Sequence, residues 1–296
     1  VARLILDENP LTGGEWYDVD KDITGITSLC DSLKTSSVTE LGLAKCQLGP
    51  GSLGKLAEYV RDAEAAVARL SLKGNFPCDR ISRDGDGMGP WLPGKNFSSW
   101  IPLCESFERS TTLTEIDLSE CYLGPEALTP LAKAVKAMAA LTSLTVDSTG
   151  VPAEYSWGSL VDGTGPKTYT LTAGEETIDL SNMNLGSADV ALVASWLQRP
   201  EVIAAVARLS LSGNMITGSL RDSSTDYEWE YDKDLSGLIS LCDALLALKN
   251  PIDLDLSECG LSVNGVNPVA KAISASAALT SINCLHNPLG EGVQVI

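Results

Sequence analysis

Hydrophobic and polar residues follow one short pattern that recurs along the whole chain. Two aliphatic positions lie two residues apart, Asn or Cys follows three residues later, and another aliphatic position comes two residues after that. The pattern is clearest in VARLSLKGN at Val67–Asn75 and VARLSLSGN at Val206–Asn214. The nine occurrences, some of them degenerate, are Leu4/Leu6/Asn9/Leu11, Leu41/Leu43/Cys46/Leu48, Leu70/Leu72/Asn75, Ile116/Leu118/Cys121/Leu123, Leu144/Val146/Thr149/Val151, Ile178/Leu180/Met183/Leu185, Leu209/Leu211/Asn214/Ile216, Leu254/Leu256/Cys259/Leu261 and Ile282/Cys284/Asn287/Leu289. Each occurrence predicts a short β-strand with buried aliphatic side chains.

A second pattern predicts helices after several of these strands. In the segment 48–67, apolar residues recur three or four positions apart, which is the apolar stripe of an amphipathic helix. These residues are Leu53, Leu56, Val60 and Ala63. Two further segments of the same design, each beginning with a Leu-Gly turn, are Leu123–Met138 and Leu185–Pro200.

The strand pattern fits L-x-x-L-x-L-x-x-N/C-x-L, so the chain resembles leucine-rich repeat proteins over essentially all of its 296 residues. The shortest units, 28 or 29 residues long, resemble the ribonuclease-inhibitor-like class, in which a full helix follows each strand. The chain is also similar to the repeat regions of intracellular NLR-type receptors and to algal leucine-rich-repeat arrays. The resemblance implies a single α/β solenoid, or horseshoe, over residues 1–296. It would have about nine repeats, a parallel sheet inside and helices outside.

Four units are longer than the others because extra residues follow the strand. We call these segments insert 1 (12–22), insert 2 (76–100), insert 3 (152–173) and insert 4 (217–234). Each is expected between a strand and a helix, on one rim of the solenoid. The phrase VARLSL recurs after 139 residues and DLSEC after 138, so a block of about four repeats is duplicated within the chain.

The inserts hold twelve of the sixteen aromatic residues, and inserts 1 and 4 share the related acidic sequences GGEWYDVDKD and DYEWEYDKD. Aromatic residues in surface segments are typical anchors of protein interfaces, and acidic neighbours favour a partner with a basic surface. The predicted partner-binding residues are Trp16, Tyr17, Asp18, Asp20, Tyr227, Glu228, Trp229, Glu230 and Tyr231. The alternative is that the aromatic residues pin each insert to its own helix layer, and both roles can hold together.

The charge balance limits the class of partner. With 39 acidic and 21 basic residues, the formal net charge is −18, which disfavours nucleic acids and anionic membrane surfaces. No run approaches the roughly eighteen apolar residues of a membrane-spanning helix, so no membrane insertion is predicted. The chain begins on a strand pattern and ends soon after Leu289 without a polar capping unit. We therefore expect a piece of a longer array.

Seven of the eight cysteines occupy repeated positions, which predicts buried thiols. Three stand at the Asn/Cys position, three lie in the phrases SLCDSL, PLCESF and SLCDAL, and one replaces a strand leucine. In that order they are Cys46, Cys121 and Cys259; Cys30, Cys104 and Cys242; and Cys284. Only Cys78 lacks such a position. Because no C-x-x-C spacing is present, we expect reduced thiols, no zinc site and an intracellular, cytoplasmic location. The glycosylation triplet at Asn96 argues weakly for the opposite.

No motif in the sequence predicts catalysis. Asp84-Gly-Asp86-Gly lacks the other ligands of a calcium loop, and Gly163–Thr168 lacks the spacing of a phosphate loop. The only histidine, His286, lies inside a repeat, so no catalytic triad can be assembled. We therefore expect no enzyme activity, no metal and no cofactor.

The strand residues between the aliphatic positions should line the concave face of the sheet. They are small, polar and mildly acidic, without an aromatic anchor: Ile5, Gly42, Ser71, Asp117, Thr145, Asp179, Ser210, Asp255 and Asn283. Ribonuclease-inhibitor-like proteins generally bind partners on this face, often through aromatic and acidic residues. This difference moves the predicted interface to the inserts.

These observations predict a non-catalytic protein–protein interaction or scaffold module that works through the inserts, the concave face or both, within a larger assembly. The alternative is a specific inhibitor or regulator of one enzyme or GTPase, because such regulators share this scaffold. A regulator should have one compact binding surface, whereas a scaffold should copurify with an assembly. A receptor ectodomain for sugars or peptides would require disulfide caps, which this sequence does not contain.

Overall fold

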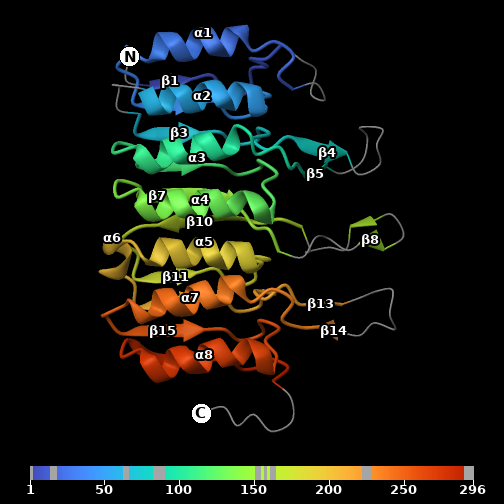
Figure 1. Cartoon of the computed structure of the whole chain (residues 1–296), viewed down its shortest axis with the longest axis vertical. Coiled ribbons are helices and arrows are strands. Elements are labelled where there is room, and N and C mark those ends of the chain that lie inside the picture. The colour runs from blue at the N-terminus through green and yellow to red at the C-terminus, as the bar shows by residue number, and fades with distance from the viewer. Residues whose placement is uncertain are drawn as a thin grey trace. The chain divides into compact units, whose positions relative to one another are not determined.

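In the computed structural model, the described residues are 3–13, 19–62, 67–82, 91–150, 155–156, 159–160, 165–221 and 229–289. They divide into two compact units, Val1–Asp147 and Ser148–Ile296. In each unit the helices form one layer and the strands of the main sheet form a second layer beside it (Figure 1).

The first unit is built from alternating strands and helices. In chain order its elements are β1 (Arg3–Ile5), α1 (Thr24–Leu33), β2 (Glu40–Gly42), α2 (Pro50–Asp62), β3 (Arg69–Ser71), β4 (Arg80–Ser82), β5 (Trp91–Pro93), α3 (Trp100–Arg109), β6 (Glu115–Asp117), α4 (Pro125–Ala137) and β7 (Ser143–Asp147). Within this unit, β1, β2, β3, β6 and β7 lie side by side in one parallel sheet. The register aligns Leu4, Leu41, Leu70, Ile116 and Leu144, so the first aliphatic positions of five occurrences form one row.

The second unit repeats this arrangement. Its elements are β8 (Tyr155–Ser156), β9 (Ser159–Leu160), β10 (Thr168–Thr172), β11 (Thr177–Asp179), α5 (Ser187–Leu197), α6 (Pro200–Ile203), β12 (Arg208–Ser210), β13 (Leu220–Arg221), β14 (Trp229–Glu230), α7 (Ser236–Leu246), β15 (Ile252–Asp255), α8 (Val263–Ala275) and β16 (Leu279–Asn283). The parallel sheet has the order β11-β12-β15-β16. Here the aligned row is Ile178, Leu209, Leu254 and Ile282.

The turn after each strand explains the Asn/Cys position. The preceding residue has a left-handed φ of 53–71° at Glu8, Lys45, Gly74, Glu120, Asn182, Gly213, Glu258 and His286. Asn75 then bridges two repeats: its Oδ1 accepts from the backbone N–H of Cys46 (3.1 Å) and Leu48 (3.0 Å), and its Nδ2 donates to the carbonyl oxygens of Leu43 and Leu72. Cys121 uses its thiol to donate to the Leu72 carbonyl oxygen (3.2 Å). Buried turns thereby keep their backbone groups paired.

The predicted α/β class is confirmed, and each of the nine occurrences contains a strand. The three predicted helices are observed as α2, α4 and α5. The expectation that insert 3 precedes a helix is wrong, because the described residues between β7 and β11 contain no helix and form β10 instead. Insert 2 also ends earlier than predicted, since Trp100 is already the first residue of α3.

All eight cysteines are free and buried, as predicted for seven of them. Cys78, which the sequence left without a position, is also fully inaccessible. Burial raises the pKa of Cys46 to about 11 and the pKa values of Cys78 and Cys259 to about 12. These thiols therefore stay protonated and unreactive at neutral pH.

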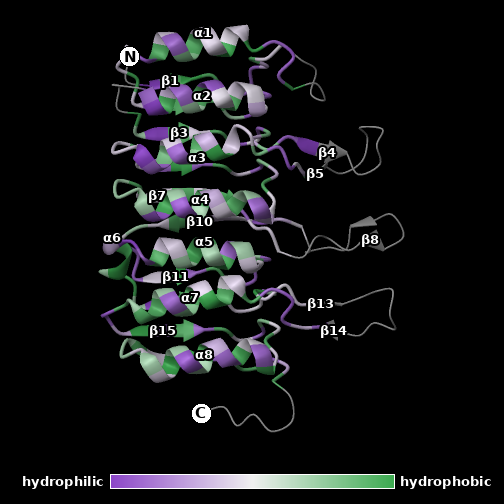
Figure 2. Ribbon diagram, viewed as in Figure 1, coloured by the Kyte–Doolittle hydropathy of each residue, from purple (hydrophilic) through white to green (hydrophobic). Residues whose placement is uncertain are grey.

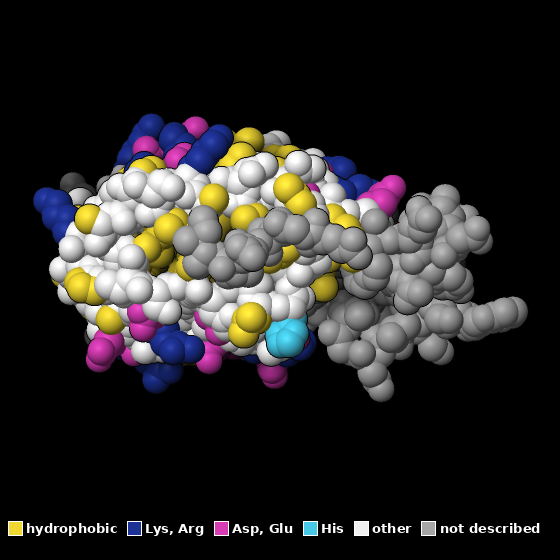
Figure 3. Space-filling model, turned by 90° about the horizontal axis from the view of Figure 1, so that it is seen from below, with side chains coloured by type: hydrophobic (Ala, Val, Ile, Leu, Met, Phe, Trp, Pro, Cys, Tyr) yellow, Lys and Arg dark blue, Asp and Glu magenta, His cyan; other side chains and the backbone are white. Residues whose placement is uncertain are grey.

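Hydrophobic and polar residues alternate along most helices, which bury one side and expose the other (Figure 2). The face over α8 and β16 departs from this rule. There Ile273 is 38% exposed and Leu285 59% exposed, and hydrophobic side chains gather along the middle of the face with charged ones at its margin (Figure 3). Among the described residues, no helix has the length and apolar character needed to cross a membrane.

Candidate functional site

The four inserts are closed at their necks, by which we mean the described residues where the chain leaves and re-enters the repeat. Each neck contains a backbone hydrogen bond across the insert. These run from Asp22 N to Thr12 O (2.8 Å), from Asn96 N to Cys78 O (3.0 Å), from Ser148 N to Lys167 O (2.9 Å) and from Asp234 N to Thr217 O (2.9 Å). The point at which each insert leaves the repeat is therefore fixed by the backbone.

Each insert also contacts the N-terminal turn of the helix in the following repeat. The contacts are Asp20 with the Gly51 N–H at α2 (2.7 Å), Lys95 with Glu126 of α4 (3.2 Å), the Tyr169 hydroxyl with Asp189 of α5 (3.1 Å), and Asp232 with the Gly265 N–H of α8 (2.7 Å). A helix N-terminus carries unpaired N–H groups and a partial positive charge, which suits the carboxylate found in each of the four contacts.

Asp20 is the best-defined of the predicted site residues. Its half-buried carboxylate accepts from the N–H groups of Gly49 (3.0 Å), Gly51 (2.7 Å) and Ser52 (3.2 Å) and from the Ser52 hydroxyl. A carboxylate with four internal donors has little capacity left for a partner's Lys or Arg. Asp20 is therefore a neck residue whose carboxylate is occupied by bonds within the chain.

The other predicted residues divide by position. Five lie outside the described residues: Trp16, Tyr17, Asp18, Tyr227 and Glu228. Trp229 lies in β14, whose backbone pairs with β13 (Figure 1). Glu230 is exposed and forms an ion pair with Lys233, and Tyr231 is 37% exposed. The structure thus brings Trp229, Glu230 and Tyr231 together on one strand and its end.

Several insert aromatics serve the interior, as the pinning alternative predicts. Trp100 is fully buried and donates from Nε1 to the Ala127 carbonyl oxygen (2.8 Å). Phe76 and Tyr169 are also buried. Burying an aromatic side chain contributes a large hydrophobic term. The pinning role therefore holds for Phe76 and Tyr169, whereas Trp100 packs as the first residue of α3.

One exposed aromatic position was missed by the sequence analysis. Tyr122, 39% exposed, stacks on Phe76 with ring centroids 5.9 Å apart, and the Arg80 guanidinium lies 3.9 Å from the Phe76 ring centroid on the neck of insert 2. Tyr122 follows Cys121 with a φ of 51°. A bulky residue in the left-handed region is uncommon, and the sequence carries no signal of this conformation.

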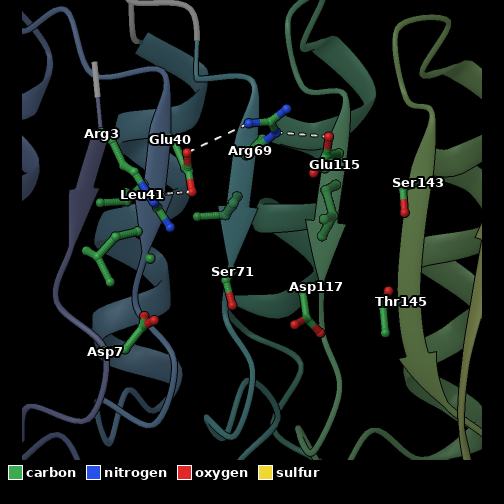
Figure 4. Close-up of a pocket in the computed structure, with 14 residues that line it drawn as sticks. Arg3, Asp7, Glu40, Leu41, Arg69, Ser71, Glu115, Asp117, Ser143 and Thr145 are labelled. Carbon is green, nitrogen blue, oxygen red and sulfur yellow. Dashed lines mark hydrogen bonds and ion pairs between the residues drawn. The ribbon is translucent and has the colours of Figure 1, made fainter. Parts of the chain in front are cut away.

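The sheet of the first unit forms a hollow of about 300 Å³ on the face away from the helices (Figure 4). Gly42 lies in its floor. A Cβ at this position would come within 2.8 Å of both Asp7 and Ile5, so a larger residue would crowd the hollow. One edge carries a row of alternating charges missed by the sequence analysis: Arg3 and Glu40 (2.8 Å), Glu40 and Arg69 (3.8 Å), and Arg69 and Glu115 (2.9 Å). The residues at this edge neutralise one another.

The acidic residues predicted for the concave face are largely occupied by turns. Asp117 accepts from both the N–H and the hydroxyl of Ser119. Asp179 and Asp255 do the same with the serines two residues further on. The two hydrogen bonds that Ser181 donates to Asp179 lower the pKa of Asp179. The Asp-x-Ser phrase is therefore an Asx turn that ends a strand.

Within the described residues, no group of three His, Cys, Asp or Glu side chains is placed to hold a metal ion. The hollow on the first sheet is shallow and lined by paired charges and hydroxyls. In comparisons with known proteins, no protein-family model and no curated protein matches this chain.

Proposed function

We propose that the chain is a non-catalytic protein-interaction or scaffold module of the leucine-rich-repeat type, in which a solenoid presents its inserts to a protein partner. The observation that carries this proposal is the recurrence of closed necks. Inserts leave alternate occurrences of the strand pattern, and each neck is anchored both across itself and to the next helix. Segments that are anchored only at their two ends can bind a partner, because the core of the fold does not depend on them.

The chemistry at insert 4 supports a protein partner. Glu230 and Tyr231 are exposed at the end of β14, next to Trp229 in the sequence. Tyr and Trp are the residues that most often anchor protein interfaces, and adjacent carboxylates steer a basic partner and select it. The net charge of −18 acts in the same direction over a longer range.

Size-exclusion chromatography and crosslinking mass spectrometry from the native source test this proposal. Lys21 and Lys233 lie at the necks of inserts 1 and 4, whereas Lys133 and Lys271 lie on the helix layer. We expect crosslinks to a partner to concentrate on Lys21 and Lys233. Crosslinks confined to Lys133 and Lys271 would place the interface on the helices and contradict the proposal.

Two substitutions then test the aromatic anchors with the partner so identified. Trp16→Ala and Trp229→Ala should each weaken association by about 2 kcal/mol or more while the fold persists. Calorimetry gives the affinity, and circular dichroism gives the fold. If both variants bind normally but their inserts become sensitive to proteases, the tryptophans are internal pins and the inserts are not the interface.

The hollow on the first sheet supports a second candidate, an inhibitor or regulator of one enzyme or GTPase, because it is a single compact surface. Gly42→Phe would fill its floor and displace the Ile5 and Asp7 side chains, because a Cβ at position 42 would lie 2.8 Å from each of them. Loss of partner binding in this variant, with crosslinks at Lys45 or Lys73 near the ends of these strands, would favour the second candidate over the first.

A further inference from the structure

Inserts 1 and 4 lie in different units, yet their necks are built alike. Both begin with a fully buried Thr followed by a Gly with a φ of 66°, Thr12-Gly13 and Thr217-Gly218. Both end with Asp-Lys-Asp, whose first Asp has a left-handed φ of 56–58°. These shared backbone conformations place the two ends of each insert in the same relation to the repeat.

The first Asp of each neck caps the start of the helix in the next repeat. The Asp232 carboxylate accepts from the Ser262 N–H (3.2 Å), the Ser262 hydroxyl and the Gly265 N–H (2.7 Å) at the start of α8. Asp20 likewise accepts from the residue before α2, Gly49, and from the N–H of Ser52 three residues later, with further bonds from the Gly51 N–H and the Ser52 hydroxyl. Both carboxylates thus hold an insert against the helix of the next repeat.

The second Asp of each neck begins the insert's own helix. Asp22 Oδ1 accepts from the Thr24 N–H, and Asp234 Oδ1 accepts from the Ser236 N–H, both at 2.9 Å. Their backbone N–H groups close the neck on Thr12 and Thr217. One Asp-Lys-Asp segment therefore joins three parts: the opposite side of the neck, the next helix and its own helix.

The segments enclosed by these two necks differ in length and sequence. Seven residues, 13–19, separate Thr12 from Asp20, and fourteen residues, 218–231, separate Thr217 from Asp232. Insert 4 contains the β13–β14 pair, whose ends Leu220 and Glu230 lie opposite each other. The same neck therefore closes whichever segment it encloses, and doubling an insert's length adds only a small entropic cost.

We infer that the Thr-Gly and Asp-Lys-Asp neck is an interchangeable socket, which presents different surface segments from one fixed position without involving them in folding. This inference stands on the neck geometry and does not depend on the proposed function. On this inference the enclosed residues determine which partner is bound. Thr12, Asp20, Asp22 and their counterparts in insert 4 only hold the enclosed segment in place.

An exchange of the enclosed segments tests the socket. Residues 15–18 are replaced by residues 220–230, and residues 220–230 by residues 15–18, so that the spacings between Thr and Asp are exchanged. Ser219, whose hydroxyl accepts from the Asp232 N–H (3.1 Å), stays in its neck. We expect a melting temperature within about 2 °C of the parent. Hydrogen exchange should show the Gly51 and Gly265 amides protected within about threefold of the parent.

Control variants show how hydrogen exchange changes when the bonds of a neck are removed. Asp20→Ala in the parent should speed exchange at the Gly51 amide by about tenfold or more, while Asp31→Ala, an exposed aspartate paired with Lys34 in α1, should leave it unchanged. If the exchanged chain loses protection at Gly51 and Gly265 as the Asp20→Ala variant does, or fails to fold, the necks are specific to their own segments and the socket is rejected.

Discussion

Asp20 in the first unit and Asp189 in the second both connect an insert to a helix N-terminus, but from opposite sides. Asp20 belongs to the neck and reaches the helix, while Asp189 belongs to α5 and reaches back to Thr149 and Tyr169 around insert 3. Asp20 is half-buried, whereas Asp189 is fully buried. An insert is therefore held to a helix by a half-buried carboxylate in one unit and by a fully buried carboxylate in the other. We expect the two carboxylates to contribute differently to the free energy of unfolding.

The buried carboxylate should have the larger effect on stability. Asp189 accepts from the N–H groups of Gly186 and Thr149 and the Thr149 hydroxyl, each at 2.8 Å, and from the Tyr169 hydroxyl at 3.1 Å. Asp189→Ala leaves these buried donors unpaired, so we expect a loss of about 3 kcal/mol in the free energy of unfolding. Urea unfolding followed by circular dichroism measures it.

Asp189→Asn is the matched control. Its amide oxygen can accept the three bonds now made by Oδ2, so at neutral pH it should lose about 1 kcal/mol or less. If Asp189→Ala is as mild as this control, the hydrogen bonds around insert 3 do not carry the stability assigned to them.

The neck carboxylates should have an intermediate effect. Asp20→Ala and Asp232→Ala each remove a helix cap, so each should lose about 1–2 kcal/mol. The two losses should be similar, because each carboxylate caps the start of the helix in the next repeat through two of its backbone N–H groups or more. Urea unfolding measures both. Unequal losses, with only one variant destabilised, would show that the two necks are not equivalent despite their geometry.

The sequence predicted the nine strands of the repeat pattern because each one repeats the same local pattern, down to the Asn75 and Cys121 positions, but it did not predict the strands within the inserts, such as β10. It could not predict Asp20 as a helix cap, because the capped residues lie about thirty positions further along the chain. The acidic phrase of insert 1 suggested a partner surface, yet Asp20 and Asp22 both accept hydrogen bonds from backbone N–H groups of the chain itself. The charge row from Arg3 to Glu115 was missed because its members become neighbours only through the strand register.

The smallest effect concerns pH, and it separates Asp189 from the exposed aspartates. Burial raises the pKa of Asp189 despite the hydrogen bonds that oppose it, whereas hydrogen bonds to Ser181 lower the pKa of Asp179. A raised pKa in the folded state gives stability that is present below the unfolded pKa of about 3.9 and is lost as the pH rises through the folded value. A lowered pKa gives the opposite: stability present above about 3.9 and lost as the pH falls.

Unfolding midpoints in urea should therefore be compared between pH 3 and pH 7 for the parent, Asp189→Asn and Asp179→Asn. Relative to the parent, Asp189→Asn should gain stability as the pH rises, because it removes a carboxylate whose ionisation the interior resists. Asp179→Asn should lose stability relative to the parent over the same range. The many other carboxylates act equally in all three proteins, so the difference between variants isolates each site. A curve for Asp189→Asn that runs parallel to that of the parent would mean that the four donors around Asp189 compensate fully for its burial, and a curve parallel to that of Asp179→Asn would mean that they outweigh it.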